Sequence, residues 1–141
     1  GGATGMGGAA SRLFAAEGAK VGILDINAKA GLEAVADIER AGGKACFVQA
    51  DVSKADQVKT AVDEVSAKLG PITVLFNHAG SIVIKPFLET TEEEWDRLTD
   101  INVKSMFLVT KAVLPQMIAA GGGSIVCTSS ISAVAGARER P

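Results

Sequence analysis

Two neighbouring serines, Ser129 and Ser130, follow the apolar run 125–128 near the end of the sequence. A short apolar run predicts a buried strand, and open α/β sheets place their chemistry at the carboxyl ends of strands. A serine there serves as a nucleophile only if a base lies beside it. The single histidine, His78, stands in a polar turn with no carboxylate partner evident in the sequence. We interpret His78 as a local hydrogen-bonding residue.

A glycine-rich loop opens the chain, and Gly5, Gly7 and Ala10 satisfy the pattern G-x-G-x-x-A at the start of a predicted helix. Small residues let the backbone approach a pyrophosphate, whose charge meets the N–H groups of the helix start. Asp25 ends the strand predicted at 21–25. A carboxylate at that position accepts hydrogen bonds from the adenosine ribose of NAD and repels the extra phosphate of NADP. The pattern therefore predicts an NAD site.

Two further strand ends carry candidate cofactor contacts. Asp51 alone is best interpreted as a turn acid or helix cap, but at the same sheet edge as Asp25 it is also placed to reach the adenine. Asn77, Ala79 and Gly80 end the next strand, where small residues let a cofactor lie against the backbone; an ordinary strand-to-loop turn is the alternative. The predicted cofactor contacts are Gly1, Thr4, Gly5, Met6, Gly7, Asp25, Ile26, Asp51, Val52, Asn77, Ala79 and Gly80.

Asn102 is an amide on the apolar stripe of a long predicted helix. It is seven residues from both Trp95 and Val109, which we assign to the core. An unsatisfied buried amide costs about 1 to 3 kcal/mol, so its polar atoms must be paired. One interpretation is a structural clamp that holds the adjacent strand. The other is an anchor for a water molecule in a proton relay at the sheet edge.

Helical and strand patterns alternate along the chain with short connections, which predicts a parallel sheet covered by helices on both faces. The predicted elements after the first helix are a strand at 21–25, a helix ending at Gly42 and Gly43, a strand from Lys44, a helix capped by Ser53 and Asp56 and ended by Gly70, a strand leading to Asn77, a long helix from Thr91, and a strand at 125–128. We expect a Rossmann-like, doubly wound α/β fold of three αβα layers. It forms a single domain over residues 1–141.

Composition narrows the classes of partner. The net charge is −2, and no cluster of Lys and Arg could follow a phosphate backbone, so we expect no nucleic-acid partner. No apolar run approaches the ~18 residues of a membrane span, and no leader pattern is visible, so we expect a cytoplasmic protein without a membrane partner. We expect no metal site. Cys46 and Cys127 lie in predicted strands and are interpreted as reduced core cysteines.

Taken together, these motifs resemble the short-chain dehydrogenase/reductase family over essentially the whole chain. The family motif T-G-x-x-x-G-x-G is matched by Gly1, Gly5 and Gly7, with the threonine falling just before the first residue. The family motif N-N-A-G is present as NHAG at 77–80, where His78 replaces the second asparagine. No Arg or Lys stands inside the glycine loop, a feature similar to the NAD-using members.

The second half of the chain resembles the catalytic half of the same family. Its catalytic asparagine matches Asn102 in DINVKSMF, and its strand-end serine matches Ser130. The resemblance implies hydride transfer between NAD(H) and an alcohol or carbonyl substrate, with a tyrosine as general acid or base and a lysine beside it. Ser130 then bonds the substrate oxygen, and Asn102 holds a water linked to the lysine. It also implies a homotetramer, or a homodimer, of the full-length protein.

Two parts of the family pattern lie outside the given sequence. The Y-x-x-x-K motif is not in it, and no strand precedes Gly1 to separate the strands that end at Asp25 and Asn77. Without that strand, backbone groups in the middle of the sheet stay unpaired. We therefore expect an internal piece of a longer enzyme, truncated at both ends. The alternatives are a non-catalytic dinucleotide-binding module or sensor, and an NADP-dependent 3-oxoacyl reductase.

Overall fold

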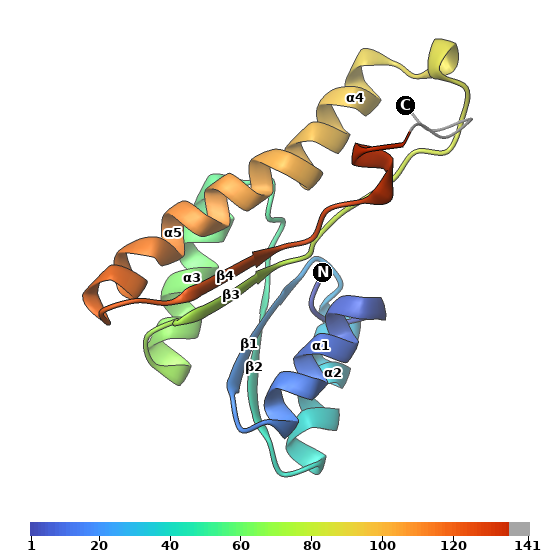
Figure 1. The fold of residues 1–141 in the computed structure, drawn as a ribbon. Coiled ribbons are helices and arrows are strands. Elements are labelled where there is room, and N and C mark those ends of the chain that lie inside the picture. The colour runs from blue at the N-terminus through green and yellow to red at the C-terminus, as the bar shows by residue number, and fades with distance from the viewer. Residues whose placement is uncertain (136–141) are drawn as a thin grey trace.

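In the computed structural model, which describes residues 1–135, four strands form two parallel pairs (Figure 1). Strand β1 (Lys20–Asp25) pairs with β2 (Lys44–Gln49), and β3 (Val74–Asn77) pairs with β4 (Ser124–Cys127). Parallel neighbours require a crossover connection, which is usually helical. Every connection within these pairs contains a helix, as the alternating sequence pattern predicts.

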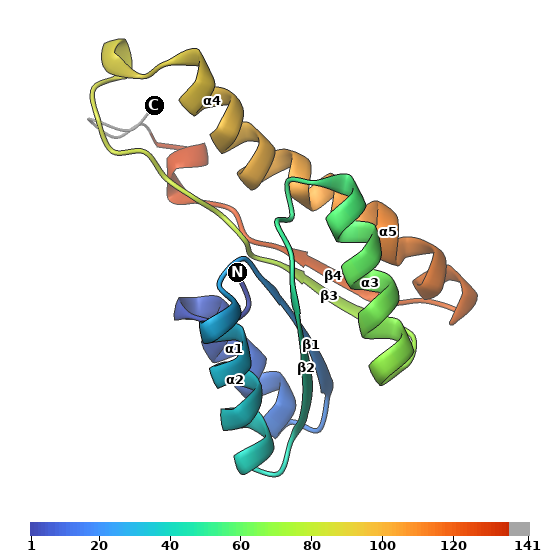
Figure 2. The same cartoon turned by 180° about the vertical axis from the view of Figure 1, so that it is seen from behind.

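The described residues also form five α-helices. They are α1 (Gly5–Ala16), α2 (Ala28–Arg40), α3 (Ala55–Leu69), α4 (Glu92–Thr99) and α5 (Ser105–Ala119), with short helical turns η1 (Phe87–Glu89), η2 (Asp100–Lys104) and η3 (Ile131–Ala133). Successive strand residues point to opposite faces. Ile23 therefore packs into the cluster formed with α1 and α2, whereas Leu24 packs against the cluster formed with α3. This arrangement confirms the predicted αβα layers (Figures 1 and 2).

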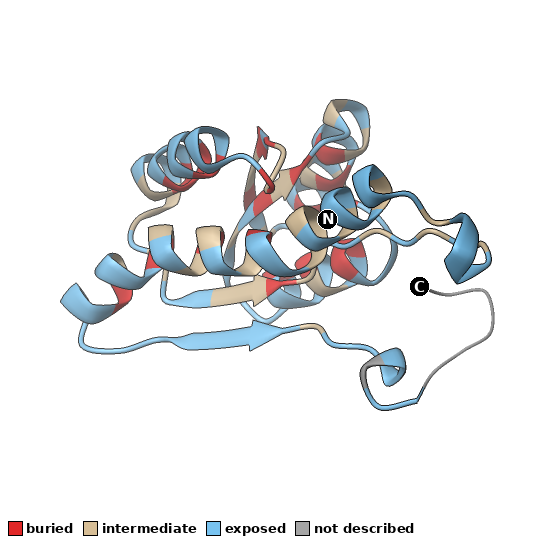
Figure 3. Ribbon diagram, turned by 90° about the horizontal axis from the view of Figure 1, so that it is seen from above, coloured by how far each residue is buried: buried red, intermediate tan, exposed pale blue. Residues whose placement is uncertain are grey.

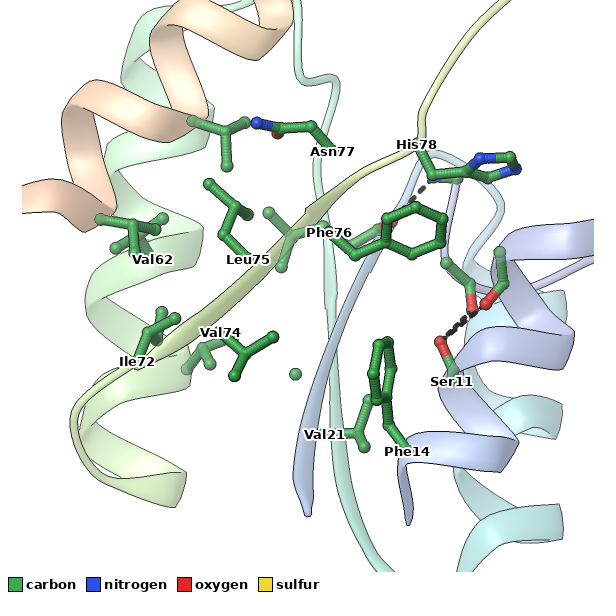
Figure 4. A pocket seen from close by; sticks show the side chains of 18 of the residues that line it. Ser11, Phe14, Val21, Val62, Ile72, Val74, Leu75, Phe76, Asn77 and His78 are labelled. Atoms are coloured by element: carbon green, nitrogen blue, oxygen red, sulfur yellow. Dashed lines mark hydrogen bonds between the residues drawn. The ribbon is translucent and has the colours of Figure 1, made fainter. Parts of the chain in front are cut away.

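The sheet is interrupted, as expected of an incomplete fold, because β1 and β3 are not hydrogen-bonded to each other. Between them lies a cavity of about 580 Å³ (Figure 4). Phe14, Val21, Val74 and Phe76 are among the apolar side chains that line it. The separation falls where the sequence predicts unpaired backbone, between the strands that end at Asp25 and Asn77.

Local capping sets where two of the helices begin and end. Asn27 caps α2, since its side chain accepts a hydrogen bond from the Ala30 amide at 3.0 Å, and Gly42, with φ of +86°, lets the chain reverse after α2 as predicted. The predicted cap of α3 is wrong. The hydroxyl of Ser53 bonds Asp51 instead, and Lys54 precedes α3 without any side-chain cap.

The long helix begins as predicted but is not uniform. Thr91 and Glu94 form a reciprocal capping box at the start of α4. The segment η2 then forms a π-helical turn between α4 and α5. A π turn takes more residues than an α turn, so residues before it lose their phase with the buried stripe of α5. Trp95 is consequently 52% exposed, and its assignment to the core is wrong.

Strand β4 is exposed along its whole length, contrary to the prediction of a buried strand (Figure 3). An apolar run is buried only where other elements cover both faces, and α5 packs on β3 rather than on β4. Cys127 is exposed for the same reason, so its assignment to the core is also wrong, while Cys46 is partly buried. Among residues 1–135, no helix has the length and apolarity needed to span a membrane.

Candidate functional site

The glycine loop lies where the ends of β1 and β3 approach each other. A Cβ atom built on Gly1 would stand 2.6 Å from the Cα atom of Ala79, and one built on Gly7 would stand 1.9 Å from the carbonyl oxygen of Gly1. Real Cβ atoms do not approach other atoms so closely, so glycine is required at both positions. The close packing brings the N-terminus of α1 to the end of β3, as expected if one ligand contacts both.

The N-terminus of α1 has the features of an anion site. Thr4 precedes the helix but its side chain makes no capping hydrogen bond, and the first turn contains no acidic residue. Thr4, Gly5 and Met6 are exposed, so the N–H groups of this turn are accessible. Helix N-termini of this kind bind phosphate groups through free N–H donors and the helix dipole. The residues therefore fit the pyrophosphate of a dinucleotide.

Asp25 lies at the end of β1 beside this loop and is 8% exposed. One carboxylate oxygen accepts the Ala3 amide at 3.2 Å, and the other accepts the Asn27 amide at 3.0 Å. Burial raises the pKa of the Asp25 carboxyl, whereas the hydrogen bonds from the Asn27 and Ala3 amides lower that pKa. Asp25 is therefore an anion at neutral pH.

The other strand-end residues on this side differ in how they are placed. Ile26 is exposed beside Asp25 and offers an apolar surface. Asp51 uses one oxygen to accept both the amide and the hydroxyl of Ser53, at 2.9 and 2.7 Å, which matches its interpretation as a turn acid. Those bonds hold the pKa of Asp51 low despite partial burial. Val52 packs against the core cluster between α3 and α5.

Asn77 is buried, and its side chain points away from the glycine loop (Figure 4). The amide nitrogen donates to Thr110 Oγ1 on α5 at 3.1 Å and to Cys127 Sγ on β4 at 3.6 Å. The side chain thus joins β3, α5 and β4, and the carbonyl of Asn77 accepts the Thr128 amide, so the described contacts of Asn77 are structural. Ala79 lies against Gly1 of the glycine loop, and Gly80 lies beside Asn102.

Ser130 is exposed beyond the end of β4 and precedes η3. Its side-chain oxygen accepts the amide of Ser132 at 3.1 Å. Because the oxygen is already an acceptor, the hydroxyl proton is free to donate to another group. This geometry suits a hydrogen bond to a substrate oxygen.

Asn102 lies within the π turn and is partly buried. Its Oδ1 accepts the Ser81 amide at 2.8 Å, and its Nδ2 donates to the Ser81 carbonyl at 2.9 Å. The side chain therefore bonds both the N–H and the C=O of one residue, as a paired strand does, and holds the loop that follows β3. Of the two interpretations of Asn102, these contacts correspond to the structural clamp, here on the loop after β3.

His78 has a partner that sequence reasoning did not find. Its Nδ1 lies 2.8 Å from Thr128 Oγ1, and its ring stacks on Phe76. The two hydrogen-bonded residues are fifty positions apart in the chain, so no local spacing could reveal the pair. Within residues 1–135, no three His, Cys, Asp or Glu side chains cluster closely enough to hold a metal ion.

Comparison with known proteins gives consistent matches. The family model described as short chain dehydrogenase matches residues 1–141. A cyclopentanol dehydrogenase of Comamonas sp. is 45% identical over 137 residues, covering 97% of this chain and 55% of that protein. A 2,5-dichloro-2,5-cyclohexadiene-1,4-diol dehydrogenase of Sphingobium indicum is 39% identical over 131 residues, covering 93% of this chain and 52% of that protein.

A 3-oxoacyl-[acyl-carrier-protein] reductase of Chlamydia muridarum is 39% identical over 137 residues, covering 96% of this chain and 55% of that protein. The chain thus spans about half the length of the curated relatives it matches. With the family model matched from end to end, and with the glycine loop, Asp25, Asn102 and Ser130 placed as described, the chain belongs to the short-chain dehydrogenase/reductase family.

Proposed function

We propose that the protein containing this chain is an NAD-dependent oxidoreductase that interconverts an alcohol and a carbonyl compound. The observation that carries this proposal is the accessible N-terminus of α1 beside the ionised Asp25. The helix start suits a pyrophosphate, and the carboxylate suits ribose hydroxyls while repelling a further phosphate. Bound NAD(H) supplies the hydride acceptor or donor.

Residues of this chain have separate roles in binding the cofactor and the substrate. Gly5 leaves open space through which the cofactor approaches the backbone, while Gly1 and Gly7 let the loop pack closely against the end of β3. Ser130 donates its free hydroxyl proton to the substrate oxygen. Asn102 fixes the loop after β3 through Ser81. In our proposal Asn102 also anchors the water that links the catalytic lysine of the full-length protein to solvent.

The substrate we propose is a small, uncharged alcohol or ketone. The loop between β3 and α4 exposes Ile82, Ile84, Phe87 and Leu88. The one lysine of this loop, Lys85, is paired with a glutamate at the start of α4 at 2.5 Å, so it is not free to bind an anionic substrate. The relatives named for cyclopentanol and for a cyclohexadienediol support this class over an acyl-carrier-protein thioester.

Assembly and location are also proposals. Helix α5 exposes Phe107, Leu114 and Ile118, an apolar surface that supports packing against a second copy. We propose a homotetramer, or a homodimer, in the cytoplasm. Light scattering of the full-length protein tests the assembly, and a monomer would contradict it.

The test of the activity is turnover by the full-length protein with cyclopentanol, followed by the absorbance of NADH. We expect product with NAD and a strong preference for NAD over NADP. Tight binding of NADH without turnover of any alcohol or ketone would favour a non-catalytic dinucleotide module. A strong preference for NADP would contradict the role given to Asp25.

A further inference from the structure

His78 joins two parts of the site that are distant in sequence. Its Nδ1 is 2.8 Å from Thr128 Oγ1, and its ring lies on the ring of Phe76, with centroids 5.1 Å apart and an interplanar angle of 24°. The ring edge reaches the glycine loop, because a Cβ atom built on Gly7 would stand 2.9 Å from His78 Cδ2. Figure 4 shows His78 directed to the side opposite Asn77, towards α1. One imidazole therefore contacts the loop and the segment after β4.

Thr128 is two residues before Ser130, and the chain between them leaves the sheet. The Thr128 amide donates to the Asn77 carbonyl at 2.9 Å, and within residues 1–135 this is the last backbone bond that ties the segment to β3. The His78 bond adds a side-chain anchor at the same residue. Ser130 itself has an extended backbone, with φ of −137° and ψ of 151°. Ser130 is only two residues from Thr128, and two residues of chain span at most about 7 Å, so fixing Thr128 limits where Ser130 can lie.

We propose that His78 is a positioning residue that holds the Ser130 hydroxyl in register with the dinucleotide-binding loop. The inference rests on the proposed function, because it assigns a task within the same reaction. His78 acts through Thr128. Its ring contacts the glycine loop at Gly7, and its Nδ1 bonds Thr128 on the segment that leads to Ser130.

A purely structural role makes a different prediction. If the ring only filled space between Phe76 and Gly7, phenylalanine would replace it without loss. If the hydrogen bond to Thr128 is what matters, His78→Phe and Thr128→Val should be equally harmful, since each removes that bond and keeps most of the volume. Asparagine at 78 keeps a group able to bond Thr128 but loses the aromatic stack.

The experiment uses the full-length protein with cyclopentanone and NADH. We expect His78→Phe and Thr128→Val each to lower kcat by about 10- to 100-fold, because small misplacements of reacting groups have effects of that size. The NADH dissociation constant, followed by fluorescence, should change by less than about threefold, a rough bound for an interaction worth under about 0.7 kcal/mol. The kinetic isotope effect on kcat with deuterated NADH should rise, since misplacement slows hydride transfer itself. Thr60→Val, on the exposed face of α3, is the matched control.

Two further measurements make the test decisive. The double variant should be no slower than either single variant, because both remove one bond. His78→Asn can still bond Thr128 but lacks the ring that lies against Gly7, so it should recover only part of kcat. A wild-type kcat for His78→Phe or for Thr128→Val would overturn the inference. So would additive losses in the double variant. If the unaltered protein neither binds NADH nor turns over substrate, the proposed function fails first, and the inference fails with it.

Discussion

At the scale of single residues, Asp25 is the side chain that holds the candidate nucleotide site together. Its two carboxylate oxygens accept backbone amides from the glycine loop and from the start of α2, so one side chain fixes both halves of the candidate nucleotide site. The same hydrogen bonds keep it charged. Glycine spacing and the position of Asp25 could be predicted because both are local. The partners of Asn77 and His78 could not, because they come from elements formed much later in the chain.

Replacing Asp25 by asparagine tests that charge. Asp25→Asn keeps the size of the side chain but removes the repulsion of a 2′-phosphate and the strong charged hydrogen bonds to ribose. We expect the preference for NAD over NADP to narrow by about tenfold or more, since hydrogen bonds to charged groups contribute about 1.5 to 3 kcal/mol. Steady-state kinetics with both cofactors measure the ratio.

The control for Asp25→Asn is Asp63→Asn on the exposed surface of α3, which changes the net charge equally. It should leave the ratio unchanged. An unchanged ratio in Asp25→Asn, with a fully folded protein, would show that cofactor choice is determined elsewhere.

Ser130 supports a second prediction at this scale. Ser130→Ala removes the hydroxyl proposed to bond the substrate oxygen, and loss of one such donor lowers kcat by about 10²-fold. NADH binding should stay unchanged. Ser132→Ala is the neighbouring control, since Ser132 contributes its backbone amide rather than its hydroxyl to the contact with Ser130. Equal activities of the two variants would remove Ser130 from the proposed site.

At the scale of elements, the start of α4 and the end of α2 were predictable, whereas the cap of α3 and the phase of the long helix were not. The capping box at Thr91 follows from residue types three positions apart, and Gly42 follows from the need for a positive φ. The π turn has no such signature in the sequence. The prediction therefore assumed a regular period of 3.6 residues through it. That assumption placed Trp95 in the core, whereas Val109, after the π turn, is buried as expected.

The clamp made by Asn102 predicts a local change in hydrogen exchange. Asn102→Ala removes both hydrogen bonds to the Ser81 backbone. Loss of about 1.5 kcal/mol of local stability corresponds to roughly tenfold faster exchange of the Ser81 amide. The Ile72 amide, held by a side chain of α5, is the internal reference and should not change. Unaltered exchange at Ser81 would mean that the loop is held by other contacts.

At the scale of the whole molecule, the described chain is two parallel strand pairs joined mainly by α3. This helix contacts β1 and β2 and also packs on α5. The order of layers follows from the alternating pattern of helices and strands. The burial of β4 could not be predicted from its sequence. An apolar run shows that a strand is suited to burial, but it does not show which elements cover that strand.

Stability should fall in acid. The pKa values of Asp25 and Asp51 are lowered in the folded state from a reference of 3.8, so between the folded and unfolded values the unfolded chain binds more protons. Their contribution is complete above about pH 4 to 5 and is lost as the pH falls through the folded values. Urea unfolding between pH 6 and pH 3 should show this decline. Asp51→Asn should flatten it, and a flat profile in the unaltered protein would contradict the assignment.

The π turn between α4 and α5 also constrains how this helix can change in evolution. Removing a single residue from 100–104 would remove the extra residue of the π turn and restore a regular α-helix, which changes the backbone geometry at Asn102 itself. Asn102 could then no longer face Ser81. We therefore expect functional homologues to tolerate insertions and deletions in the neighbouring loops while keeping the residue count of this turn fixed.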